Sequence, residues 1–322
     1  MTATLLSGDC RELLPTLPAH SVQTIVTSPP YWRMRQYTDD PRELGQEDTP
    51  AAYVAALAAV FAACWRVLRD DGTLWLNLGD KYGAGGNLGR KDTSAAYLAR
   101  RAAQYGTGTG SGSAVKNGSA YPRVKGIHSK NLLGLPWRVA FALQDAGWVL
   151  RNDIIWYKPN AMPEPVKDRC SMAHEYLFVF SKQGAYVFDG AAIAEPAIST
   201  TNRGGKKAQR LVQASGQKGD GFQERWKPKE IRNARTVWSI ATAGIPDAHY
   251  APMPEALARR CILAGSRPGD TVLDPFAGSG TTLRAAVSLE RHAVGIDLGY
   301  ADLQERRLDG VQIAMTALET TS

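Results

Sequence analysis

Two short segments of the sequence combine residue types that can hold ligands. The first is Ser28-Pro-Pro-Tyr-Trp32, in which two successive prolines fix the backbone and a tyrosine follows them directly. A ring presented in this way can stack on a planar ligand. The alternative is a plain Pro-Pro turn with a buried tyrosine, and the pentapeptide alone does not separate the two.

The second segment is a glycine turn, Asp274-Pro-Phe-Ala-Gly-Ser-Gly-Thr-Thr282, between an expected strand and an expected helix. Its small residues let a ligand approach the backbone, and free N–H groups at a helix start suit a carboxylate or phosphate. It lacks the G-x-G-x-x-G pattern of dehydrogenases, because Leu283 takes the place of the last glycine, and no Walker lysine follows. Asp297, after the next strand, could accept hydrogen bonds from two ribose hydroxyls, cap the following helix, or do both.

Both segments follow strands of an expected α/β sheet. The β-type runs cover residues 4–8, 24–27, 73–78, 153–157, 175–181, 271–273 and 292–296. Helical patterns cover residues 11–17, 50–68, 132–146, 281–289 and 300–318, and residues 70–72 are expected to end the second of these helices. Such alternation predicts a doubly wound, mostly parallel sheet with helices on both faces and ligands at the carboxyl ends of its strands.

The net charge of +7 is concentrated in two segments. Residues 81–130 hold nine basic side chains against one acid, and residues 199–235 hold ten against three. Both segments are rich in small polar residues and carry little apolar periodicity, which predicts long loops or poorly ordered insertions. Solvated loops need no partner, but two such runs that also contain aromatic residues favour a polyanion such as nucleic acid.

Together, the two turns resemble the catalytic and S-adenosyl-L-methionine-binding motifs of the amino-group DNA methyltransferases. Leu6-Ser-Gly-Asp9 resembles the adenine-contacting motif of that family, and His249-Tyr-Ala-Pro-Met-Pro254 its helix-leading motif near the methionine of the cofactor. The catalytic motif comes first in the chain, which is the order of the permuted group called β. The resemblance covers nearly the whole chain outside the basic segments and implies a circularly permuted, Rossmann-like methyltransferase fold with basic loop insertions.

The resemblance also implies a division of the chain. Residues 1–80 and 131–187 would form the catalytic half of the sheet, and residues 245–322 the cofactor-binding half, with the C-terminal helix leading back beside the N-terminal strand. Residues 81–130 would be a basic, flexible insertion over the DNA, and residues 188–240 a target-recognition segment. With 322 residues the chain has no room for a nuclease domain, so restriction activity would need another polypeptide.

The implied reaction is methyl transfer to the exocyclic amine of a base flipped out of duplex DNA. Adenine-specific members mostly carry Asp or Asn where this chain has Ser28, whereas Ser-Pro-Pro-Tyr is more typical of cytosine N4 enzymes. Cytosine is therefore favoured, and adenine N6 is the alternative. Attack on carbon 5 of cytosine is disfavoured, because no proline precedes any of the four cysteines. More remote alternatives are an inactive DNA-binding module and the methylation of RNA or of a protein glutamine, whose enzymes use Asn-Pro-Pro-Tyr.

The resemblance assigns the site residues by motif. The Ser28 hydroxyl and the Pro29 carbonyl would accept hydrogen bonds from the amino group, and Tyr31, after Pro30, would stack on the base. The cofactor-binding residues would be Asp9, Cys10, Asp274, Phe276, Ala277, Gly278, Ser279, Gly280, Thr281, Thr282, Asp297, Leu298, His249 and Pro254. The DNA-binding residues would be Trp32, Arg203, Lys206, Lys207, Arg210, Lys218, Arg225, Lys227, Lys229 and Arg232.

The composition argues against other classes of protein. No signal peptide is visible, and the longest apolar run, residues 51–65, is shorter than the roughly 20 residues of a membrane span. Four scattered cysteines indicate a reducing cytoplasm, and neither cysteines nor histidines form a metal-binding pattern. We therefore expect a cytoplasmic, nucleoid-associated protein without a metal or a membrane. Its expected partner is double-stranded DNA, with a separate restriction endonuclease and a second copy of the chain open as further partners.

Overall fold

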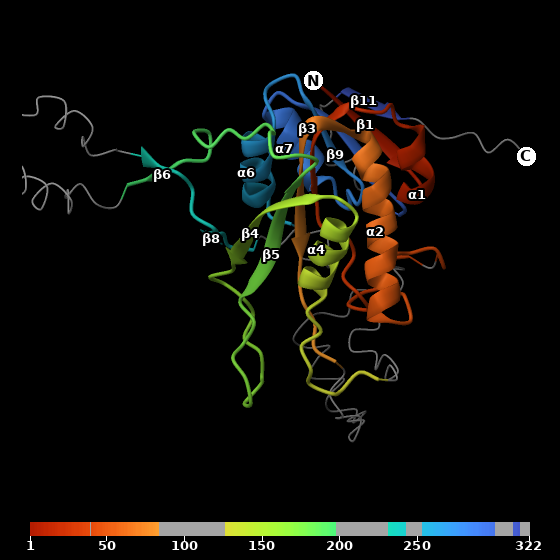
Figure 1. Cartoon of the computed structure of the whole chain (residues 1–322), viewed down its shortest axis with the longest axis vertical. Coiled ribbons are helices and arrows are strands. Elements are labelled where there is room, and N and C mark those ends of the chain that lie inside the picture. Colours follow the sequence, from red (N-terminus) through yellow and green to blue (C-terminus); the bar gives the residue numbers. More distant parts are fainter. Residues whose placement is uncertain (39, 84–125, 198–230, 243–252, 300–311, 316–322) are drawn as a thin grey trace, which may run out of the picture.

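A nine-stranded sheet organises the chain in the computed structural model, which describes residues 1–38, 40–83, 126–197, 231–242, 253–299 and 312–315. The strand order is β11-β1-β10-β9-β2-β3-β5-β4-β8, and two further strands, β6 and β7, pair separately. Figure 1 shows the sheet between helices, with α2 and α4 on one side and α6 and α7 on the other. The prediction of a doubly wound α/β fold is confirmed.

The elements have the following bounds. The strands of the main sheet are β1 (Thr2–Ser7), β2 (Val22–Thr27), β3 (Leu68–Leu78), β4 (Val149–Tyr157), β5 (His174–Ser181), β8 (Val237–Ser239), β9 (Thr271–Asp274), β10 (His292–Asp297) and β11 (Gln312–Met315). The separate pair is β6 (Glu195–Pro196) and β7 (Ile231–Arg232). The helices are α1 (Cys10–Leu13), the 3-10 helix η1 (Leu14–Thr16), α2 (Pro50–Val67), α4 (Leu135–Asp145), α6 (Glu255–Gly265) and α7 (Thr281–Ser288).

The sheet brings distant parts of the chain together. Neighbouring strands from β11 to β3 are parallel, and β5 runs antiparallel to both of its neighbours, β3 and β4. The N-terminal strand β1 pairs with β10, so that Ala3 lies opposite Ala293. Strand β2 pairs with β9 through Thr24–Val272 and Ile25–Leu273. Because β2 and β9 are parallel neighbours, the two motifs that follow them leave the sheet side by side.

Each face of the sheet buries its own hydrophobic cluster. On β3, Leu74, Leu76 and Leu78 point to the side of α2 and α4, whereas Trp75 points to the side of α6 and α7. This alternation has the period of two that a strand covered on both faces requires. The two clusters cover the faces of the sheet. The motif segments emerge at its carboxyl edge, where β2 and β9 end.

Helix α2 begins and packs as the sequence predicts. Thr49 accepts a hydrogen bond from the Ala52 N–H at 3.1 Å, and Pro50 takes the first helical position. By length and composition alone the helix could cross a membrane, a test that core helices of globular proteins also meet. A third of its residues are buried, including Leu57 and Phe61, and they pack in the same cluster as α4. That the protein does not span a membrane stays a prediction.

The residues expected to end α2, and part of the helix expected over residues 300–318, form strands instead. Helix α2 stops at Val67, and residues 70–72 lie within β3, whose pairing with β2 shifts register between Val22 and Thr24. Such an irregularity lets a strand include the polar residues that we expected to end the helix. Within residues 300–318, where a helix was expected, the described residues 312–315 form the strand β11, which pairs with β1 from Thr2–Gln312 to Leu5–Met315. A strand there supplies hydrogen-bond partners along the outer edge of β1, which a helix could not do.

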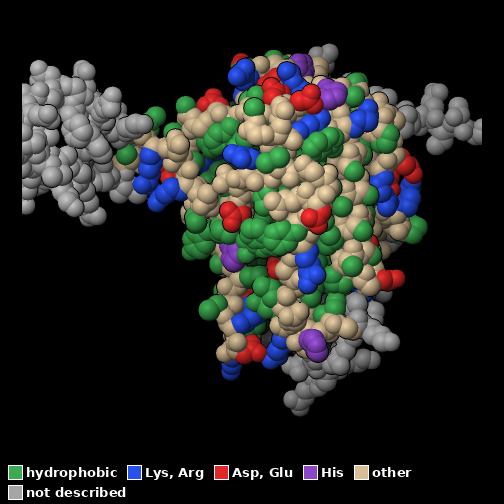
Figure 2. Space-filling model, viewed as in Figure 1, with side chains coloured by type: hydrophobic (Ala, Val, Ile, Leu, Met, Phe, Trp, Pro, Cys, Tyr) green, Lys and Arg blue, Asp and Glu red, His purple; other side chains and the backbone are tan. Residues whose placement is uncertain are grey.

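The two basic segments lie largely outside the described residues. The residues that flank the second segment are anchored to the core: β8 extends the main sheet by pairing with β4, and Ile193 and Trp238 are buried. Lys81, the first cation of the segment at 81–130, lies half-buried and donates to the Arg33 carbonyl, and burial lowers the pKa of Lys81 to about 8. On the face that Figure 2 shows, Lys and Arg side chains are mixed with Asp and Glu.

Gly265 allows α6 to approach the sheet closely, which leads to a stability prediction. A Cβ atom there would lie 2.6 Å from the Thr73 hydroxyl and 2.7 Å from the Thr24 hydroxyl, which bond to each other at 2.9 Å. We expect Gly265→Ala to lower the free energy of unfolding by about 1–3 kcal/mol in urea titrations, because the buried polar pair must move. The control is Gly184→Ala, where a Cβ meets no atom within 4 Å. Equal stability of both variants would contradict the prediction.

Candidate active site

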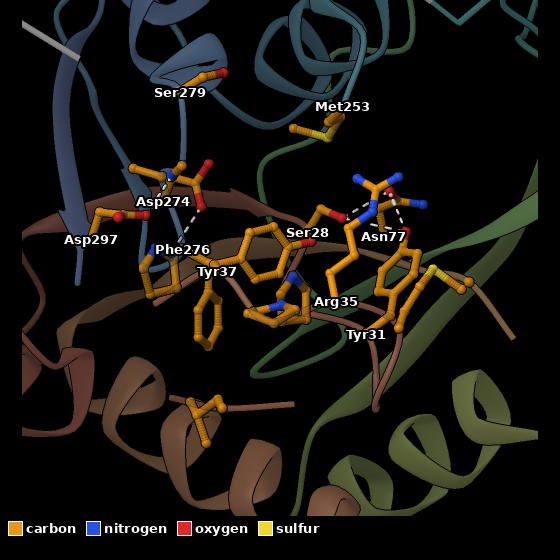
Figure 3. A pocket seen from close by; sticks show the side chains of 18 of the residues that line it. Ser28, Tyr31, Arg35, Tyr37, Asn77, Met253, Asp274, Phe276, Ser279 and Asp297 are labelled. Atoms are coloured by element: carbon orange, nitrogen blue, oxygen red, sulfur yellow. Dashed lines mark hydrogen bonds between the residues drawn. The ribbon is translucent and has the colours of Figure 1, made fainter. Parts of the chain in front are cut away.

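One cavity of about 460 Å³ at the carboxyl edge of the sheet receives both motifs. Figure 3 shows Asp274, Phe276, Ser279 and Asp297 on one side of it, and Ser28, Tyr31 and Asn77 on the other. The aromatic ring of Tyr37 lies between the two groups (Figure 3). Figure 1 shows the β4–β5 connection extending beyond the sheet, and Glu164 and Met172 of this connection also line the cavity.

The segment after β2 is held by hydrogen bonds that leave one carbonyl for the cavity. The buried Tyr53 hydroxyl donates to the Pro30 carbonyl at 2.9 Å, and the Met34 N–H donates to the Tyr31 carbonyl at 3.1 Å. No group among the described residues donates to the Pro29 carbonyl. Ser28 and Pro29 both line the cavity beside Tyr31, so this carbonyl and the Ser28 hydroxyl are two acceptors that a ligand there could use.

Tyr31 is fixed by its hydroxyl and by its ring. The hydroxyl donates to Glu175 Oε2 at 2.6 Å, and it lies 3.1 Å from Asn77 Oδ1. Burial and the nearby Glu175 carboxylate raise the pKa of Tyr31 well above its usual value, so the hydroxyl stays a donor. A Cβ on Gly79 would lie 2.6 Å from the ring, so only glycine leaves room for this position. Tyr31 is therefore presented to the cavity in one orientation.

Polar side chains from three strands complete this side of the cavity. Asn77 Nδ2 donates to Glu175 Oε2 at 3.0 Å and to the Tyr176 carbonyl at 3.1 Å. Lys158, just after β4, forms an ion pair with Glu175 Oε1 and lies 4.6 Å from the centre of the Trp156 ring. The side chains of Lys158 and Glu175 are only 19% and 14% exposed. The Tyr31 hydroxyl is thus part of a buried, largely satisfied polar network.

The glycine turn on the other side is held by a buried carboxylate. Asp274 Oδ1 accepts hydrogen bonds from the Thr27 hydroxyl at 2.6 Å and from the Phe276 N–H at 3.1 Å. Burial raises the pKa of Asp274 to about 6. Gly278 and Gly280 have φ angles of +49° and +78°, which a side chain would strain. The turn therefore gives a ligand close access to backbone atoms at the start of α7.

Asp297 and the segment after β1 shape the rest of this side. Asp297 Oδ2 accepts from the Gly278 N–H at 2.7 Å and Oδ1 from the Gly299 N–H at 2.9 Å. The second bond has the form of a cap for the chain that follows, and the carboxylate also lines the cavity. Asp9 caps α1 through the Arg11 N–H, and burial raises the pKa of Cys10 to about 12. The helix that Asp297 was expected to cap lies outside the described residues, so that alternative stays a prediction, as does the contact with a ribose.

The structure brings together most of the residues that the sequence predicts for the site. The predicted residues that line the cavity are Ser28, Pro29, Pro30, Tyr31, Asp9, Cys10, Asp274, Phe276, Ala277, Gly278, Ser279, Thr281, Thr282, Asp297 and Leu298. Gly280 and Pro254 do not line it; Gly280 precedes α7, and Met253 lines the cavity where Pro254 was expected. His249 and the predicted DNA-binding residues Arg203 to Lys229 lie outside the described residues.

Two predicted DNA-binding residues have other surroundings. Trp32 is 4% exposed in the hydrophobic core, where its Nε1 donates to the Glu47 carbonyl at 2.8 Å, so its predicted contact with DNA is wrong. An indole of this size adds more to stability when buried than when exposed. Arg232 lies in β7 with its guanidinium 3.7 Å from Glu195 Oε2, beside the ion pairs that Arg235 and Arg260 make with the same glutamate.

Several further residues line the cavity that were not predicted from the sequence: Arg35, Tyr37, Asn77, Lys158, Glu175 and Met253. Asn77 carried a signal, since it is the polar residue within the otherwise apolar run of residues 74–78. Lys158 directly follows a strand, and charged residues at strand ends in α/β sheets are candidates for a site. Tyr37 and Arg35 carried none, because their place depends on a loop in which Glu43 accepts the Tyr37 N–H at 2.8 Å.

Comparison with known proteins gives consistent matches. Residues 22–303 match the family model N6_N4_Mtase, described as DNA methylase. The Type II methyltransferase M.SmaI of Serratia marcescens is 41% identical over 307 residues, covering 94% of this chain and 90% of the relative. The Type II methyltransferase M.Cfr9I of Citrobacter freundii is 41% identical over 310 residues, covering 96% and 88%.

Solved structures match over nearly the whole chain as well. A Thermus thermophilus protein described as a putative DNA modification methylase, in complex with S-adenosyl-L-methionine, has a TM-score of 0.58 at 25% identity and covers 99% of both chains. The cytosine-N4-specific PvuII DNA methyltransferase has a TM-score of 0.60 at 18% identity, covering 97% of this chain and 95% of that one. At this lower identity the likeness concerns the fold alone.

Burial of Asp274 predicts a change of stability with pH. Folding raises its pKa from 3.8 to about 6, so the folded chain binds the extra proton between these values, and stability falls as the pH rises through that window. Asp274→Asn keeps Oδ1 as an acceptor but cannot ionise. We expect the free energy of unfolding of the variant relative to the unsubstituted chain to rise by up to about 3 kcal/mol between pH 4 and 7.

Urea unfolding at a series of pH values measures this difference. The matched control is Asp145→Asn, at an exposed position. Its free energy of unfolding should change with pH in the same way as that of the unsubstituted chain. If the curves of Asp274→Asn and the unsubstituted chain run parallel from pH 4 to 7, Asp274 does not hold the extra proton.

Proposed function

The chain belongs to the N6_N4_Mtase family of DNA methylases, and we propose that it methylates the exocyclic N4 amine of a cytosine at a specific site in duplex DNA. Its methyl donor is S-adenosyl-L-methionine. The observation that carries the choice of an amine is the pair of acceptors at the cavity, the Ser28 hydroxyl and the Pro29 carbonyl. Serine at this position, rather than Asp or Asn, favours cytosine over adenine.

The residues on the other side of the cavity fit the donor. The glycines of the turn leave its backbone open to a ligand, and the Asp297 carboxylate could accept hydrogen bonds from ribose hydroxyls. The apolar Phe276, Met253 and Leu298 offer surfaces for the adenine and the methionine chain. When bound, the cofactor supplies an electrophilic methyl group.

The catalytic residues act by holding the base. An exocyclic amine is a poor nucleophile, because its lone pair is conjugated with the ring. Acceptors at Ser28 and Pro29 would bind the two amino hydrogens and favour a more tetrahedral nitrogen, whose lone pair can then point at the methyl group. Tyr31 would stack on the base and replace part of the stacking lost on flipping, which is worth a few kcal/mol. The remaining catalysis comes from proximity.

We also propose roles for the segments outside the cavity. The basic residues in 81–130 and 199–235 would bind phosphates and base edges, because such clusters neutralise the DNA backbone. As in Type II systems, from which the named relatives come, the partner would be a separate endonuclease acting on the same sequence. The site of action would be the cytoplasm, on nucleoid DNA, and a second copy of the chain is a further proposed partner.

Mass spectrometry of nucleosides tests the proposed function. Plasmid DNA from a methylation-deficient host that expresses the chain should contain N4-methylcytosine, and DNA from a host expressing Tyr31→Ala should not. N6-methyladenine in its place would support the alternative within the same family. If neither base appears while the purified chain binds S-adenosyl-L-methionine, the DNA substrate proposed here is wrong.

Removal of either group that contacts the base should affect turnover but not cofactor binding. We expect Ser28→Ala and Tyr31→Ala to lower kcat by about 100-fold or more, because each loses an interaction that strengthens in the transition state. The Kd for S-adenosyl-L-methionine, from calorimetry, should stay within about twofold, since neither residue belongs to the glycine turn.

Tyr186→Ala is the matched control for these variants. Tyr186 follows β5 at the opposite edge of the sheet, where its ring lies 5.2 Å from the Arg151 guanidinium. Turnover of Tyr186→Ala should equal that of the unsubstituted chain. A Ser28 or Tyr31 variant with unchanged turnover would contradict the assignment of these two residues to the base.

A further inference from the structure

A chain of hydrogen bonds runs from Ser28 to a carboxylate that the proposed reaction does not itself require. Glu175 is largely buried, and an ionised carboxylate can only accept hydrogen bonds. Its Oε1 is taken by the ion pair with Lys158. Its Oε2 lies 2.6 Å from the Tyr31 hydroxyl and 3.0 Å from Asn77 Nδ2. Both of these groups must therefore donate to Glu175.

This acceptor determines which way the Asn77 amide points. Its NH₂ group faces two acceptors, Glu175 Oε2 and the Tyr176 carbonyl at 3.1 Å. The flipped amide would place its oxygen against both of them, with repulsion and no hydrogen bond. Asn77 Oδ1 therefore faces Ser28 and can only accept there.

The orientation of Asn77 in turn determines the direction in which the Ser28 hydroxyl donates its proton. The Ser28 hydroxyl lies 3.1 Å from Asn77 Oδ1 and 3.4 Å from the Tyr31 hydroxyl oxygen, and it donates inward to them. The Tyr31 hydroxyl has a single proton, and it donates this proton in a hydrogen bond to Glu175 Oε2 at 2.6 Å. With its only proton directed inward, Ser28 keeps lone pairs for a donor in the cavity that it lines.

We propose that Glu175, Asn77 and Lys158 are positioning residues that fix the direction of these hydrogen bonds, so that Ser28 faces the target amine as an acceptor. The inference rests on the proposed function, since an amino group is the donor that needs this acceptor. Lys158 contributes by holding Oε1, so that Oε2 stays directed at Tyr31 and Asn77.

Glu175→Gln tests the direction of the bonds with almost no change of shape. The glutamine has one acceptor oxygen, which Lys158 and the Tyr31–Asn77 pair both require. With its oxygen on Lys158, its NH₂ group opposes the NH₂ group of Asn77. The Asn77 amide then flips, which gives up its bond to the Tyr176 carbonyl, and presents NH₂ to Ser28. The Ser28 hydroxyl then directs its proton into the cavity, where the hydroxyl repels the amino hydrogens of the base instead of accepting a hydrogen bond from them. We expect kcat to fall about 100-fold, with KM for DNA and Kd for the cofactor within about threefold.

Removing the ammonium group of Lys158 should rescue that variant. In the double variant Glu175→Gln with Lys158→Met, no ammonium group competes for the glutamine oxygen. This oxygen can then accept from Tyr31 and Asn77, which restores the original direction of the hydrogen bonds. Methionine keeps the unbranched chain beside Trp156. The double variant should be at least about tenfold faster than Glu175→Gln alone, whereas independent structural damage would make it slower. Lys158→Met alone should be slow, because it leaves Glu175 charged and unpaired.

A second readout does not depend on turnover. The 13Cζ resonance of Tyr31, assigned by its loss in Tyr31→Phe, reports whether the hydroxyl donates. It should shift in Glu175→Gln and return toward its original position in the double variant, in the full chain without DNA. Folding of each variant is checked by its thermal unfolding.

The outcomes separate this inference from the proposed function. If the unsubstituted chain methylates DNA but Glu175→Gln keeps its kcat within about threefold, or the double variant is slower still, the positioning role is wrong. If the unsubstituted chain methylates no DNA, the proposed function fails, and the resonance of Tyr31 still decides the direction of the bonds. An unmoved resonance in Glu175→Gln would overturn the inference in either case.

Discussion

The site depends on the parallel pairing of β2 with β9. These strands are distant in the sequence, and their pairing places Thr27 against Asp274, whose side chains form a buried 2.6 Å hydrogen bond. The next residues along the chain are Ser28 on one strand and the glycine turn on the other. Because both strands end at the same edge of the sheet, the segment proposed to bind the amine and the turn proposed to bind the cofactor share one cavity. A shift in this pairing would separate the two.

Rigidity of the catalytic side comes from polar contacts rather than from the prolines alone. The Tyr53 hydroxyl donates to the Pro30 carbonyl, and the Tyr31 hydroxyl donates to Glu175. Gly79 leaves space for the Tyr31 ring. These contacts come from α2, from the residue that follows β3 and from β5, so three parts of the chain determine the position of one short loop. A methyltransferase that acts on a weak nucleophile benefits from acceptors that are already oriented, since no reorganisation is then needed in the transition state.

Local sequence patterns predicted the two motif segments, the strands that precede them and the α/β class, because glycine turns, Pro-Pro and buried β-runs are local signals. They did not predict β11, since Ile313 and Met315 suit either a strand or a helix and the edge of β1 decides between them. Nor did they place Glu175 beside Tyr31, which depends on the antiparallel pairing of β5 with β3. Trp32 was misassigned for the same reason, because only the packed core shows which aromatic side chains are buried.

In the proposed reaction, one cavity holds an amine of the target base between Ser28, Pro29 and the methyl donor. A crystal structure of the chain with S-adenosylhomocysteine and a duplex that contains the methylated sequence measures this directly. The account predicts an extrahelical cytosine whose N4 atom lies about 2.7–3.2 Å from both Ser28 Oγ and the Pro29 carbonyl oxygen. A target base that remains stacked in the duplex, or that enters the cavity with its amino group away from these two acceptors, would contradict it.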